Sequence, residues 1–115
     1  MSARLRVVRL SSDISDLEMV YARPPAPLRG LVTSYCGYLE TGGQPVRRME
    51  PPSSQSVLII GLGSPICLSA PESPAQSLAS FYGALADGPV WTESSGEQGG
   101  IEVTLTPLGA YRLLQ

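Results

Sequence analysis

The sequence of 115 residues contains neither histidine nor lysine. Without histidine there can be no Ser-His-Asp triad, no Cys-His pair and no histidine-based metal site. Without lysine the chain cannot form a Schiff base, and it lacks the lysine with which a P-loop holds phosphate. These absences predict a protein that is not an enzyme and that carries no metal or cofactor.

Positive charge is also scarce. Eight arginines stand against ten acidic residues, which gives a net charge of -2. A surface that binds duplex DNA needs several clustered basic side chains that contact phosphates. Arg4, Arg6 and Arg9 form a small cluster near the start of the chain. We interpret this cluster as part of a solvated N-terminal segment, with contact to nucleic acid as the alternative.

The chain has two cysteines, Cys36 and Cys67, which do not form a CxxC metal pair. Their separation favours two free thiols in a cytoplasmic protein, with a disulfide between them as the alternative. The sequence shows no secretory signal and no apolar run of about 18 residues, so we expect no membrane association.

Proline and glycine, by contrast, are abundant, with 11 and 12 residues. Because proline is excluded from helix interiors and from central strand positions, its spacing excludes long helices between residues 24 and 107. The sequence therefore predicts one mainly β domain over residues 24–115, with barrel-like or cupin-like antiparallel sheets and a C-terminal helix. A partly flexible segment, 1–23, is expected to precede it.

Runs of β-branched and aromatic residues between turn signals mark the expected strands. These strands are 31–40, 46–50, 56–62, 66–70, 78–85, 90–94 and 100–106. We expect the first of them to carry a bulge or a close backbone approach at Gly37 and to pair with the second as a hairpin. Residues 56–70 are expected to form another hairpin, and turns are expected at 41–43 and 86–89.

The segment before the first proline allows two interpretations. Ile14, Leu17 and Tyr21 recur at helical spacing, and Ser12 could cap a short helix there. Alternatively, residues 17–22 form an edge strand.

Residues 100–106 show the clearest alternation in the chain. Ile101, Val103 and Leu105 are expected to face the core. The intervening residues, Glu102, Thr104 and Thr106, are expected to face water.

The last segment carries the signals of a helix start. Thr106 suits an N-cap and Pro107 suits the first helical position, so a helix is expected over 107–115. Leu108, Tyr111 and Leu114 would lie roughly along one side of it. The chain ends inside this helix without a stop signal, which suggests a fragment of a longer protein.

Three aromatic residues are the candidate ligand-binding residues: Tyr35, Tyr38 and Trp91. The odd spacing of the two tyrosines places them on opposite faces of one strand unless a bulge at Gly37 realigns them. Trp91 offers a flat surface and one N–H, although a core position is the commoner use of such a residue. No catalytic or metal-binding residue is expected.

Two apparent sites are better explained by structure. Residues 57–63 resemble the start of a dinucleotide-binding turn, but position 66 is Ile and Pro71 would stop the required helix. Carboxylates could pair across strands as an acid and a base, although solvated strand and turn positions are the simpler explanation. They are Glu40, Glu50, Glu93, Glu97 and Glu102.

Five stretches together resemble the N-terminal domain of AraC-type bacterial transcription regulators of actinobacterial character. They are PAPLRGLVTSYCGYLETG at 25–42, RRMEP at 47–51, VLIIGLGSP at 57–65, SFYGAL at 80–85 and GGIEVTLTPLGA at 99–110. The resemblance implies a barrel-like domain that senses a small-molecule effector, mediates homodimerisation, or does both. It also implies that DNA is bound only through a C-terminal domain with two helix-turn-helix units, which this chain lacks.

The sequence departs from the family at one place. Members of the family often carry a histidine just before the Gly-Ile strand, where this chain has 96–100 without one. A histidine-dependent role is therefore not implied. The alternative to the regulator is a stand-alone β-barrel domain that binds a small molecule or another protein, and a small enzyme on a cupin-like scaffold is a third hypothesis.

Overall fold

The computed structural model describes residues 5–13, 15–42, 45–50, 56–70, 73–83, 90–94 and 97–113. The elements within these residues are β1 (Leu5–Ser11), β2 (Asp16–Ala22), a 3-10 turn η1 (Ala26–Leu28), β3 (Val32–Thr41), β4 (Val46–Glu50), β5 (Ser56–Gly61), β6 (Ile66–Ala70), β7 (Ser73–Leu78), β8 (Phe81–Gly83), β9 (Val90–Ser94), β10 (Gln98–Leu105) and α1 (Pro107–Leu113). The chain is mainly β with a C-terminal helix, which confirms the predicted fold class.

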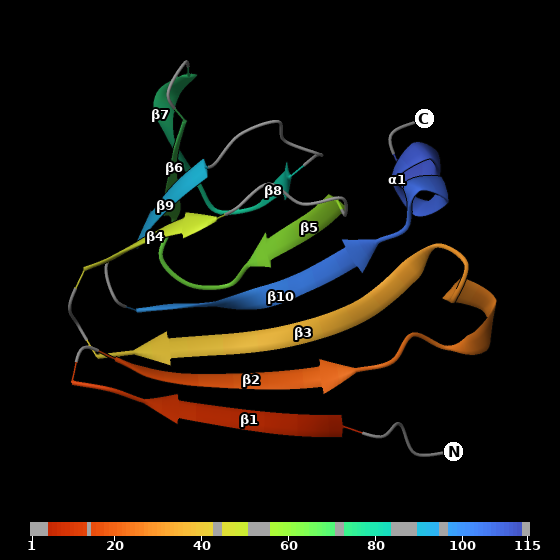
Figure 1. Ribbon diagram of the computed structural model, residues 1–115, viewed down its shortest axis with the longest axis horizontal. Coiled ribbons are helices and arrows are strands. Elements are labelled where there is room, and N and C mark those ends of the chain that lie inside the picture. Colours follow the sequence, from red (N-terminus) through yellow and green to blue (C-terminus); the bar gives the residue numbers. More distant parts are fainter. Residues whose placement is uncertain are drawn as a thin grey trace.

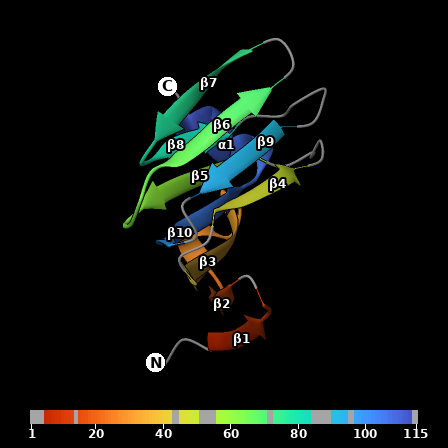
Figure 2. The same ribbon diagram turned by 90° about the vertical axis from the view of Figure 1, so that its left-hand side faces the viewer.

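The strands form two antiparallel sheets (Figure 1). The first has six strands in the order β1-β2-β3-β10-β5-β8, and the second has four in the order β4-β9-β6-β7. Figure 2 shows the four-stranded sheet from its broad side, with β1 and β2 of the other sheet farthest from it. The sheets remain open rather than closing into a barrel.

The register of the six-stranded sheet assigns each side chain to one of two faces, because directly paired residues lie on the same face. One row of paired residues is Arg6, Tyr21, Cys36, Glu102, Ile59 and Phe81. We call its side the inner face, since Arg48 of the four-stranded sheet contacts this side. The next row is Val7, Val20, Gly37, Ile101 and Ile60, on the outer face.

A small hydrophobic core lies where α1 meets the six-stranded sheet. Val32, Leu105 and Ala110 are buried there, with partly buried Leu31, Tyr35, Tyr82 and Val103 around them. Thr106 caps the helix: its hydroxyl accepts a hydrogen bond from the Gly109 N–H at 3.0 Å and donates one to the Gly30 carbonyl at 2.8 Å. The predicted N-cap and helix start are confirmed.

The predicted core face of residues 100–106 is only partly correct. Leu105 is buried beside α1, but Ile101 is 38% exposed on the outer face. Glu102, expected to face water, lies on the inner face between the buried residues Cys36 and Ile59. The physical reason is that the second sheet covers the polar side of this strand, whereas α1 covers only one end of its apolar side.

Both predicted hairpins are wrong. Strand β4 pairs with β9 rather than with β3, because β2 and β10 already occupy the two edges of β3. Strand β6 pairs with β7 and β9 in the other sheet, because β10 and β8 occupy both edges of β5. In both cases the chain crosses to the other sheet where the sequence suggested a turn back.

Three local predictions are also corrected. The ladder passes through Gly37 without a register shift, and the irregularity lies at Thr104/Leu105 instead. Of the two interpretations of the segment before the first proline, the strand is confirmed by β2 and the helix is wrong; the Ser12 hydroxyl accepts a hydrogen bond from the Ser15 N–H in the turn between β1 and β2. The strand expected over 78–85 is divided between the end of β7 and the short β8.

The N-terminal segment supplies β1 and β2, which extend the six-stranded sheet beyond β3. Strand β2 is therefore internal, and β1 is the edge. Arg4, Gly43, Leu114 and the turn at 86–89 lie outside the described residues. Within the described ranges, no helix is both long and apolar enough to span a membrane.

Candidate functional site on the inner face

A buried carboxylate joins the two sheets. Glu40, at the end of β3, is 0% exposed. Arg48 of β4 donates two hydrogen bonds to it, from Nη1 to Oε1 at 3.1 Å and from Nη2 to Oε2 at 2.5 Å. Gln98 Nε2 and the Ser15 hydroxyl donate two more, each at 3.0 Å. Such a bidentate, charge-assisted pair fixes the position of β4 over the inner face.

The hydrogen bonds from Arg48 hold the pKa of Glu40 below its ordinary value, although burial acts in the opposite direction. Gln98 and Ser15 lower the pKa further. A carboxyl group whose pKa is depressed on folding stabilises the protein above its unfolded-state pKa, and this contribution is lost as the pH falls toward the folded-state pKa.

We therefore expect the free energy of unfolding to decrease as the pH is lowered below about 5, toward the depressed folded-state value. The decrease should be shallower in Glu40→Gln, which has no carboxyl group to titrate. Urea unfolding at several pH values measures the slope of the free energy of unfolding against pH in the wild type and in Glu40→Gln. Parallel slopes in the two proteins would contradict this assignment.

Gln98 leaves one buried acceptor without a donor. Its Nε2 binds Glu40, but its Oε1 has no hydrogen-bond partner among the described residues. A buried acceptor without a partner costs about 1–3 kcal/mol. A donor supplied by a bound molecule would recover this cost, so Gln98 Oε1, although closed to solvent in this structure, is a candidate anchoring atom.

Tyr38 lies beside Gln98 on the inner face, directly opposite Gly100. A Cβ atom at Gly100 would come within 2.9 Å of the Tyr38 hydroxyl and 2.5 Å of the Ile60 carbonyl oxygen. The tyrosine ring therefore lies over the backbone of β10 at a position that only glycine permits. Burial raises the pKa of Tyr38, and the nearby Glu102 carboxylate raises it further, so the phenol is neutral at pH 7.

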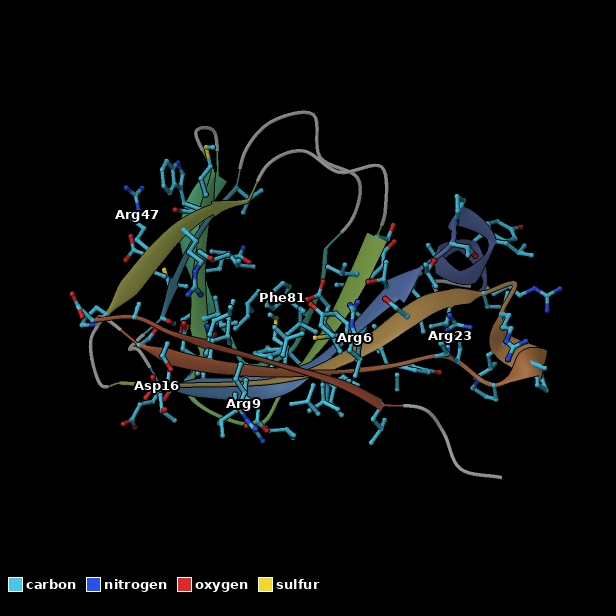
Figure 3. The ribbon with its side chains drawn as sticks, turned by 60° about the horizontal axis from the view of Figure 1, so that its bottom comes forward. Arg6, Arg9, Asp16, Arg23, Arg47 and Phe81 are labelled. Atoms are coloured by element: carbon cyan, nitrogen blue, oxygen red, sulfur yellow. The ribbon has the colours of Figure 1, made fainter. Side chains whose placement is uncertain are left out.

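The neighbouring row adds a second phenol and a thiol. Burial raises the pKa of Tyr21 and of Cys36, whose side chains also interact with each other. The guanidinium of Arg6 lies 4.6 Å from the centre of the Tyr21 ring. Figure 3 shows Arg6 and Phe81 on the inner side of the sheet and Arg9 on the opposite side. The inner face thus presents two phenols and a thiol, together with the Glu102 carboxylate and one stacked cation.

Trp91 lies apart from these groups. It belongs to β9, where it pairs with Met49 of β4, two residues from the pairing of Arg47 with Glu93. Within the four-stranded sheet, this register places Trp91 on the same face as Arg47 and on the opposite face to Arg48. Because Arg48 points toward the inner face of the six-stranded sheet, the indole of Trp91 points away from it. The Arg47 guanidinium lies 4.0 Å from the centre of the Trp91 ring and forms a 3.0 Å ion pair with Glu93.

The structure does not bring the three candidate aromatic residues together. Tyr38 is on the inner face, Tyr35 packs into the core beside α1 on the outer face, and Trp91 lies on the far side of the other sheet. Since no bulge realigns the strand at Gly37, the two tyrosines remain on opposite faces. Tyr38 is the candidate that belongs to the site.

No signal in the sequence predicts Glu40, Arg48 or Gln98 as site residues. Glu40 was interpreted as a solvated carboxylate, yet it has the most buried side chain of the described residues. Its spacing from Arg48 and Gln98 carries no signal, because the contacts depend on how β3, β4 and β10 are assembled. The described residues contain no group of three or more Cys, Asp or Glu side chains that could hold a metal ion.

Comparison with known proteins found no match: no protein-family model fits the chain, and no curated protein is similar to it.

Proposed function

We propose that this chain is the effector-binding regulatory domain of an AraC-type transcription regulator, and that it binds a small molecule on the inner face. The observation that carries the proposal is the buried, unpartnered Oε1 of Gln98 on that face, at a position diagonal to Tyr38. The open antiparallel fold and the sequence resemblance support it. Both cysteines are free thiols, which supports a cytoplasmic location.

The inner face favours an uncharged effector, because its charged side chains, Arg6 and Glu102 besides the Glu40–Arg48 pair, balance in sign. The pKa values of Tyr21, Cys36 and Tyr38 ordinarily lie above 7 and burial raises them further, so all three groups are neutral at pH 7. The charge of Glu40 is already neutralised by Arg48. A ligand with an aromatic or aliphatic body and a single donor for Gln98 Oε1 fits these groups.

The proposed response to the effector uses the link between the sheets. A regulatory ligand must bind one conformational state more tightly than another. Arg48 ties β4 to Glu40 beside Gln98, so a ligand on Gln98 would bias the position of the four-stranded sheet. Control of DNA binding would pass through a separate DNA-binding domain.

A thermal-shift screen with small neutral phenols, amides and lactones tests the proposal. We expect at least one compound to raise the Tm of the wild-type chain. Tyr38→Phe should weaken its binding by about 5- to 10-fold, the effect of one lost hydrogen bond. Trp91→Phe is the matched control and should bind normally. Hits that bind equally well to Tyr38→Phe would place the site elsewhere, and the absence of hits would contradict the sensor role.

A protein-interaction domain is the second candidate, favoured by the surface of α1. Leu108, Tyr111 and Leu113 are 51%, 63% and 48% exposed. Exposed apolar groups of this kind mark interaction surfaces when they cluster. A screen without hits, together with self-association that Leu108→Ser abolishes, would favour this function over the sensor.

A further inference from the structure

The two sheets have four edge strands, and three of them are protected against pairing with another chain. Strand β8 has only three residues, β7 contains Pro74, and β4 follows Pro45 and carries Arg47 and Arg48. Short length, proline and charge are the usual means by which proteins block their sheet edges. The fourth edge, β1, has seven residues and no proline.

Strand β1 is also the most apolar of these edges on its surface. Leu5, Val7 and Leu10 are 62%, 49% and 54% exposed. In Figure 1, β1 forms the bottom border of the six-stranded sheet, and no described element lies beyond it. A long, exposed apolar edge strand is a template for pairing with another strand.

The charges of β1 are turned away from this open edge. Arg6 stacks over the ring of Tyr21, and the Arg9 side chain donates a 2.9 Å hydrogen bond to Glu18. Both partners belong to β2, on the other side of β1. The two arginines project to opposite faces of the sheet, as Figure 3 shows, so neither side chain blocks the edge.

The sequence of β1 is complementary to itself when two copies run antiparallel about Val8. All seven residues then find a partner, and residues of the same face are paired: Val8 with Val8, Val7 with Arg9, Arg6 with Leu10 and Leu5 with Ser11. No arginine faces an arginine. The aliphatic stems of Arg6 and Arg9 would cover the exposed side chains of Leu10 and Val7 of the second copy.

We propose that β1 pairs with β1 of a second copy of this chain, antiparallel and centred on Val8, so that two six-stranded sheets become one continuous sheet. This inference names the surface of a homodimer. It rests on the edge strand alone and stands whether or not the inner face binds an effector.

Cysteine cross-linking tests the register. In a Cys67→Ser background, Val8→Cys places two thiols opposite each other, within the distance that a disulfide can bridge. Val7→Cys is the matched control: Val7 is well exposed, yet its copies would be offset by two positions and about 7–8 Å apart. We expect Val8→Cys to form the covalent dimer at least tenfold faster than Val7→Cys. Equal rates, or a faster Val7→Cys, would overturn the proposed register.

Sedimentation at several concentrations tests the dimer itself. The wild type should self-associate, and Val8→Lys should be monomeric because two ammonium groups meet at the axis. Leu62→Lys, at a position 74% exposed outside the strands, is the control and should self-associate normally. A wild type that is monomeric at every concentration would overturn the proposal. If Val8→Lys fails to fold, the cysteine pair decides. If it folds as a monomer, a rise in its Tm with a compound from the thermal-shift screen shows that effector binding is independent of the dimer.

Discussion

Arg48→Met is expected to lower the free energy of unfolding by about 3 kcal/mol at pH 7, because it leaves the fully buried carboxylate of Glu40 without its counter-ion. Methionine keeps much of the aliphatic length of the arginine, so the loss reports the charge rather than a cavity. Glu40 would then keep only the hydrogen bonds from Gln98 and Ser15. The loss should shrink as the pH is lowered, because without Arg48 burial raises the pKa of the Glu40 carboxyl group, which then becomes protonated.

A double-mutant cycle separates the ion pair from the surrounding packing. Glu40→Gln should cost less than Arg48→Met, because the Arg48 side chain is 43% exposed and can be solvated when it loses its partner. Adding Glu40→Gln to Arg48→Met should restore part of the lost stability, since no buried charge remains. Arg47→Met, whose ion pair with Glu93 is exposed, is the control and should cost less than about 1 kcal/mol. Strictly additive effects at 40 and 48 would show that the two side chains do not interact.

Gly109→Ala is expected to lower the free energy of unfolding by about 2–3 kcal/mol, although alanine is the better helix former. A Cβ atom at this position would lie 1.9 Å from the carbonyl oxygen of Leu31, which is backbone and cannot rotate away. The helix would have to move off the small core around Val32 and Leu105.

Gly30→Ala is the matched control for this substitution. A Cβ atom there meets nothing within 4 Å, although Gly30 lies next to Leu31. The free energy of unfolding of Gly30→Ala should be unchanged or slightly higher than that of the wild type, because alanine restricts the unfolded chain. Urea unfolding of the two variants makes the comparison. If Gly109→Ala were as stable as the wild type, the close contact between α1 and residues 30–31 would be refuted.

The sequence predicted elements better than it predicted their partners. The alternation at 101–105 identified β10, and Thr106 with Pro107 identified the start of α1, because both signals are local. The partners of β4 and β6 were not predictable, because a strand's own residues do not show which edges of its neighbours are already occupied. The position of Ile101 was not predictable for a similar reason. Its apolar character predicted burial, but the packing of α1 and the second sheet determines which face of β10 is covered.

The candidate site was predictable only in part. Tyr38 was identified as an aromatic candidate, and the structure places it beside Gln98. Glu40 resembled Glu93, since both are glutamates near the end of a strand, yet one is fully buried and the other is exposed. The difference arises from Arg48, which reaches Glu40 only because the chain crosses between the sheets after β3. Contacts of this kind have no sequence spacing that could reveal them.

The central position of β10 has a consequence for the order of folding. This strand pairs with β3 on one side and with β5 on the other, yet it follows all the other strands in the chain. Strands β1 to β3 can form a meander early, but the sheet cannot extend past β3 until residues 98–105 are available. Pairings so distant in sequence make folding slow, because the entropy of loop closure is lost before the contacts form. During synthesis on the ribosome, the open edge of β3 is thus exposed until the last strand emerges.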